Sequence, residues 1–173
     1  MKKRTSFITL AAIIAAIYAT LTIATWQFSS LAIQVRLAEA LCILPAFTPA
    51  AIPGLTIGCA LSNAISGNII DTIFGTAATL LAAILTRVLA KVLGGRCFWL
   101  YPAPAVIVNA IFVPFILYYG YGFTTFGSSS GTLLVLSIYA LSVFIGQTIV
   151  CYGVGIPLYI TLKKHQKIFN WRM

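Results

Sequence analysis

Long apolar runs separated by short polar or proline-containing stretches dominate this chain. Four of them come close to or exceed the roughly 20 residues that a helix needs to cross the hydrocarbon core of a bilayer. These runs predict membrane-spanning helices over residues 7–25, 69–92, 102–119 and 132–162, the last with length to spare. The first run follows a basic start, as a secretory signal does, but its full span length favours a retained helix.

A fifth apolar segment, residues 36–68, is harder to interpret. It is apolar enough for one crossing, but Pro45, Pro49 and Pro53 each remove a helix hydrogen bond and disfavour helix in the preceding residue. The alternatives are one interrupted crossing or two short helices. A short, proline-interrupted pair at membrane depth would indicate a binding site.

Charge placement decides between one crossing and two. The positive-inside rule places basic clusters in the cytoplasm, so an even number of crossings must separate each cluster from the next. Two short helices, over about 37–48 and 51–66, meet this condition, whereas a single crossing does not. The sequence therefore predicts an all-α bundle of six transmembrane helices, residues 1–173 as one domain, with both termini cytoplasmic. The clusters are Lys2, Lys3 and Arg4; Arg87, Lys91 and Arg96; and Lys163, Lys164, Lys167 and Arg172.

Composition supports a membrane protein and limits its chemistry. The mean hydropathy is +1.03, and 8% of residues are charged, against about 25% in soluble domains. We read the net charge of +9 as topogenic rather than as a nucleic-acid surface. The four cysteines show no CxxC spacing, which favours apolar packing. With His165 as the one histidine, we expect no metal site, no cofactor and no catalytic set.

Only two acidic residues are present, Glu39 and Asp71, and both are predicted near the outer ends of apolar helices. An ionisable group within a membrane segment costs a few kcal/mol or more and usually marks a functional site. Two simpler explanations remain open. Glu39 could pair with Arg36 at i, i+3 on a helix surface, and Asp71 could interact favourably with the positive end of its own helix.

Amides and small residues complete the candidates. Amides in apolar helices often hydrogen-bond between helices, which is our preferred role for Gln147. Tyr118 could belong to an interfacial aromatic belt or line a planar ligand. The candidate ligand contacts are Glu39, Asp71, Asn109, Arg36, Asn63, Asn68 and Tyr118. Alanines at i, i+4 spacing in the first helix form a surface for close packing, within the bundle or on a partner; they are Ala11, Ala12, Ala15, Ala16 and Ala19.

Several stretches resemble the queuosine-precursor transporter family, the QueT-type substrate-binding components of energy-coupling factor (ECF) vitamin transporters. The likeness covers most of the chain and is most specific over residues 34–79. It is carried by QVRLAEAL at 34–41, LP at 44–45, PAAIPGLTIGC at 49–59, DTIFGTAAT at 71–79 and PAVIVNA at 104–110.

The resemblance implies a substrate-binding S-component rather than an enzyme. Such a component would capture a 7-deazaguanine, the aminomethyl precursor preQ1 or queuine, outside a bacterial plasma membrane. A coupling transmembrane subunit, docked on the alanines of the first helix, and two cytoplasmic ATPase subunits would drive uptake. The chain lacks a GxxxxGK[ST] loop, so a partner must hydrolyse the ATP.

The ligand chemistry suits the two acids. We expect one of them to bind the guanine-like edge and the other the cationic arm, with Asn109 and Asn63 satisfying other polar atoms. Three alternatives differ in cargo or class. They are an S-component for another vitamin or nucleobase, a self-contained secondary carrier or channel, and a membrane enzyme.

Overall fold

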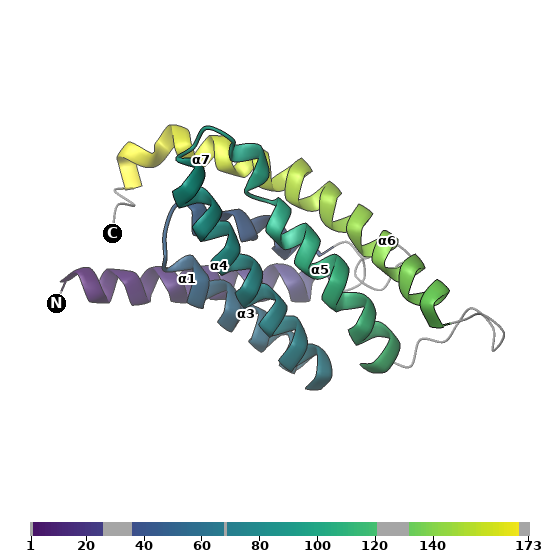
Figure 1. Cartoon of the computed structure of the whole chain (residues 1–173). Helices are drawn as coiled ribbons and strands as arrows, with labels where there is room; N and C mark the ends of the chain where they lie inside the picture. Colours follow the sequence, from purple (N-terminus) through teal and green to yellow (C-terminus); the bar gives the residue numbers. More distant parts are fainter. Residues whose placement is uncertain (1, 26–35, 68, 121–131, 170–173) are drawn as a thin grey trace.

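The computed structural model of the protein describes residues 2–25, 36–67, 69–120 and 132–169, and these residues form an all-helical bundle (Figure 1). Within them lie six helical segments, several of which change helix type along their length. The segments are α1 (Lys2–Ala24); η1 (Leu37–Ala46); α3 (Ala51–Ile65); η2 (Asp71–Gly75) with α4 (Thr76–Leu93); η3 (Phe98–Leu100) with α5 (Ala103–Phe115) and η4 (Ile116–Gly120); and α6 (Thr132–Val150) with η5 (Cys151–Gly155) and α7 (Ile156–Phe169).

The predicted helix pattern is confirmed in the part of the chain that the structure describes. Four segments are long and apolar enough to cross a membrane, namely Arg4–Ala24, Asp71–Leu93, Phe98–Tyr118 and Thr132–His165. The apolar segment between the first two of these spans forms two short helices, as predicted from the placement of the basic clusters.

The first of the short helices, Leu37–Ala46, is a 3₁₀ helix and not an α-helix. Pro45 lies inside it and has no N–H to donate. At about 2.0 Å per residue, ten 3₁₀ residues extend about 20 Å, compared with about 15 Å in an α-helix. The tighter winding therefore lets a short segment reach further through the bundle.

Helices α1 and α3 pack closely and in parallel through small residues. A Cβ atom at Gly54 would lie 2.8 Å from the Ala11 carbonyl oxygen, and one at Gly58 would lie 2.8 Å from that of Ala15. Ala11 and Ala15 are accordingly buried within the bundle. For these two alanines, the close packing is with another helix of the same chain and not with a partner. The other three predicted docking residues lie elsewhere on α1, with Ala12 and Ala16 exposed and Ala19 half-buried.

One end of the bundle gathers basic residues and aromatic rings. Arg87 donates through Nη1 to the carbonyl oxygens of Pro45 and Ala46, at 3.1 and 3.3 Å. Lys163 of α7 lies 6.0 Å from the ring centroid of Phe98, in the connection between α4 and α5. Figure 1 places the start of α1 and the end of α7 at this end as well. Arg87 and Lys163, which belong to two of the three basic clusters, thus lie at the same end of the bundle.

Candidate ligand-binding site

Glu39, in the first turn of η1, is the centre of a buried polar network. Its side chain is 2% exposed. Oε1 accepts a hydrogen bond of 2.7 Å from the Tyr18 hydroxyl of α1. Oε2 accepts from Asn109 Nδ2 of α5 at 3.2 Å and from Cys42 Sγ at 3.0 Å. Three helices therefore converge on this carboxylate, and each of these donors is a neutral group.

Asp71 lies in a different electrostatic environment. It begins the π-helical turn η2 at the start of the helix that continues as α4, and it is 4% exposed. Its Oδ2 accepts a 3.0 Å hydrogen bond from Arg36 Nη2, which makes an ion pair between the buried Asp71 and the partly buried Arg36. Arg36 thus pairs with Asp71, and the surface pair with Glu39 that sequence spacing allowed is not formed. Asp71 also lies in the first turn of η2, the position on which the simpler helix-end explanation depends.

The surroundings of Asp71 are closely fitted. Asn63 of α3 donates through Nδ2 to the Asp71 backbone carbonyl at 3.0 Å. A Cβ atom at Gly75 would lie 2.7 Å from Asp71 Oδ1 and 3.0 Å from Asn63 Nδ2. Because real Cβ atoms do not approach so closely, glycine at position 75 is what allows the carboxylate and the amide to lie together. Such π-turns are frequent at functional sites.

Arg36 connects the two acids. It occupies the extended residue just before η1, three residues ahead of Glu39. Its guanidinium donates to Asp71, while Glu39 follows it in the first turn of η1. We refer to the resulting group as the polar cluster; its members are Tyr18, Arg36, Glu39, Asn63, Asp71 and Asn109.

Five of the seven predicted ligand contacts thus fall within the polar cluster. Tyr118 lies in η4, where its hydroxyl shares a 3.1 Å hydrogen bond with Thr132 Oγ1. Asn68 lies outside the described residues. Gln147 is buried, and its Oε1 accepts from Cys151 Sγ of the same helical segment at 3.6 Å.

Sequence reasoning missed Tyr18 and the polar role of two cysteines. Tyr18 is 1% exposed, and its hydroxyl makes the shortest of the hydrogen bonds to Glu39. A tyrosine within an apolar helix is a usable signal, since a buried tyrosine hydroxyl usually finds a partner. Cys42 donates to the Glu39 carboxylate, and Cys151 donates to the Glu39 backbone carbonyl. Both are free, buried thiols.

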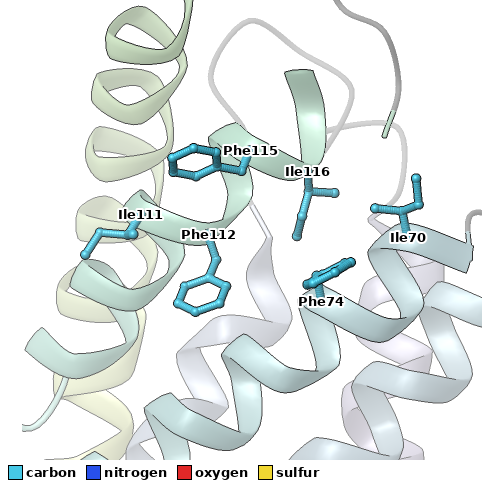
Figure 2. A pocket seen from close by; sticks show the side chains of 6 residues that line it. All are labelled: Ile70, Phe74, Ile111, Phe112, Phe115 and Ile116. Carbon is cyan, nitrogen blue, oxygen red and sulfur yellow. The ribbon is translucent and has the colours of Figure 1, made fainter. Parts of the chain in front are cut away.

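A separate cavity of about 370 Å³ opens between the start of the α4 segment and the end of α5 (Figure 2). Among the described residues, the side chains that line it are all apolar; they are Ile70, Phe74, Ile111, Phe112, Phe115 and Ile116. In Figure 2 these side chains extend from the two helices around a common space. Neither Glu39 nor Asp71 lines this cavity, so its described lining offers no polar side chain to a hydrogen-bonding base.

A helical bundle with four span-length apolar segments and a buried polar cluster defines a multi-pass membrane protein. The family model described as QueT transporter matches residues 8–164. The chain therefore belongs to the QueT transporter family, and it is a transport protein rather than an enzyme. No curated protein and no solved structure matches the chain.

Proposed function

We propose that this chain is the substrate-binding S-component of an ECF importer and that it captures a cationic 7-deazaguanine from outside the cell. The observation that carries the proposal is the buried Glu39 carboxylate, which meets only neutral donors among the described residues. An ionised group at this depth is costly without a counter-charge. A ligand that brings a cation and several N–H donors would supply it.

The chemistry of the precursors suits the polar cluster. The base edge of a deazaguanine presents adjacent N–H donors, which a carboxylate can accept in parallel. The arm of preQ1 or queuine carries an amine that is protonated at neutral pH. Two buried carboxylates, one arginine and two amides within one cluster can satisfy both parts of such a molecule.

The cluster is packed closed in this structure, with Asp71 held by Arg36 and Glu39 held by Tyr18, Asn109 and Cys42. Ligand entry therefore requires these side chains to move or to share their partners. The described lining of the separate cavity is apolar, which favours the polar cluster as the place where the base is recognised.

The exposed face of α1 suits docking on a coupling subunit. Only 17% of its span is buried inside the bundle, compared with 56% of the span Phe98–Tyr118. Ala12 and Ala16 lie on this exposed face at i, i+4, a spacing that allows close helix contact. In the proposed complex, two ATPase subunits on the cytoplasmic side of a bacterial plasma membrane provide the energy.

Ligand identity is tested by thermal unfolding of the purified chain in detergent. We expect preQ1 to raise the unfolding temperature, and thiamine, riboflavin and biotin to leave it unchanged. We expect Glu39→Gln to reduce the preQ1 shift. A shift with one of the vitamins and none with deazaguanines would contradict the proposed cargo.

Energy coupling is tested separately by uptake into cells that express the chain with and without the ATPase and coupling subunits. We expect uptake only with them; uptake by the chain alone would indicate a self-contained carrier. Ala16→Leu should abolish uptake while binding remains. The matched control is Ala77→Leu, the same change at an exposed position of α4, which should leave uptake intact.

A further inference from the structure

We propose that the two buried acids have different tasks: Glu39 pairs with the ligand's ammonium, and the Arg36–Asp71 ion pair reads the neutral edge of the base. This assignment rests on the proposed function, because it takes the ligand to be a base that carries an alkylammonium arm. It also predicts a preference, since a precursor without a positive arm should bind more weakly.

The charges around the acids carry the first step. Asp71 already has a cation at 3.0 Å, so the pair has no net charge. Glu39 is held by a hydroxyl, an amide and a thiol. Arg36, Asp71 and Glu39 together therefore carry one uncompensated negative charge, that of Glu39. Since charges are costly inside a membrane protein, a ligand with one positive charge is the favoured guest.

Repulsion supports the same assignment. An ammonium placed against Asp71 would also lie against the Arg36 guanidinium, 3.0 Å from that carboxylate. Like charges at such a distance oppose each other strongly where water is excluded. An ammonium against Glu39 would meet the hydroxyl of Tyr18 and the amide of Asn109, which can reorient around it.

Acceptor capacity supports it as well. A carboxylate offers about four lone-pair positions. Within the described part of the chain, Glu39 uses three, one on Oε1 and two on Oε2. The remaining position, on Oε1, can accept an N–H of the ammonium without displacing a protein donor. The oxygen that accepts from Tyr18 is therefore the expected contact atom.

The Arg36–Asp71 pair has the donor and acceptor pattern that complements a guanine-like edge. The carboxylate can accept from the ring N–H and the exocyclic amine, while the guanidinium donates to the ring carbonyl oxygen. A neutral ion pair and a neutral edge match in charge.

The test compares two ligands that share the base and differ in the charge of the arm, preQ1 with its aminomethyl group and preQ0 with its nitrile. Dissociation constants for both are measured on the full chain and on variants, and the readout is the ratio of the two constants. In the unchanged chain we expect preQ1 to bind at least about tenfold more tightly, about 1.4 kcal/mol. We expect Glu39→Gln to bring the ratio close to one.

Asp71→Asn should weaken both ligands to a similar extent and keep the ratio. Arg36→Lys keeps the positive charge but loses the planar guanidinium, so it should also weaken both ligands and keep the ratio. It replaces Asp71→Asn in the test if that variant does not fold. A ratio near one in the unchanged chain would overturn the assignment, as would a ratio that collapses in Asp71→Asn and survives in Glu39→Gln. If neither ligand binds the unchanged chain, the proposed function itself fails.

Discussion

Glu39 and Asp71 are buried to nearly the same degree, 2% and 4% exposed, yet their charges are compensated in different ways. Asp71 has a dedicated cation, Arg36, supplied from the start of η1. Glu39 has three neutral donors, supplied by α1, α5 and η1 itself. The difference shows that burial alone does not identify a ligand-binding acid. What matters is whether the protein already neutralises it.

The largest effect on stability should come from removing the cation of the compensated acid. Arg36→Gln leaves the buried Asp71 without a counter-charge, and removing the partner of a buried charge costs about 3 kcal/mol. We expect unfolding by denaturant in detergent to show this loss. The double variant Arg36→Gln with Asp71→Asn should recover most of it, because no lone charge remains. An equal loss in both variants would mean that the arginine acts through packing alone.

An intermediate effect is expected at the uncompensated acid when one of its neutral donors is removed. Tyr18→Phe deletes the 2.7 Å hydrogen bond to Glu39 Oε1 and keeps the ring. Hydrogen bonds to charged groups contribute about 1.5–3 kcal/mol, so we expect a loss of about 2 kcal/mol in the free energy of unfolding. In the background of Glu39→Gln the same change should cost less. Identical costs in both backgrounds would show that the hydroxyl does not act on the carboxylate.

The smallest effect on stability should follow the removal of the uncompensated charge itself. Glu39→Gln keeps the size of the side chain and an acceptor oxygen while relieving a buried charge. We expect the unfolding free energy of the ligand-free chain to change by less than about 1 kcal/mol. Asp71→Asn, which leaves Arg36 without its partner, should cost clearly more. Equal losses in the two variants would remove the distinction between the acids.

Hydropathy and charge placement were enough to predict the helices. The predicted short pair, 37–48 and 51–66, corresponds closely to Leu37–Ala46 and Ala51–Ile65. This worked because each apolar run is long and the positive-inside rule restricts the number of crossings. The 3₁₀ winding of the first short helix was not predicted, since apolar content does not distinguish helix types.

The partners within the polar cluster were harder to predict than its members. Glu39, Asp71, Arg36 and Asn109 could be selected because polar groups are rare in this chain. Local spacing suggested that Arg36 would meet Glu39, three residues away, but the fold brings it to Asp71, 35 residues away. Contacts of this range depend on how the helices pack, which one sequence does not specify.

The central claim is tested most directly by an experimental structure of the chain with bound preQ1. The account predicts the ammonium within hydrogen-bond distance of a Glu39 carboxylate oxygen and the base edge against Asp71 and Arg36. A base lodged instead in the apolar cavity between Phe74 and Phe112, with neither carboxylate in contact, would contradict it.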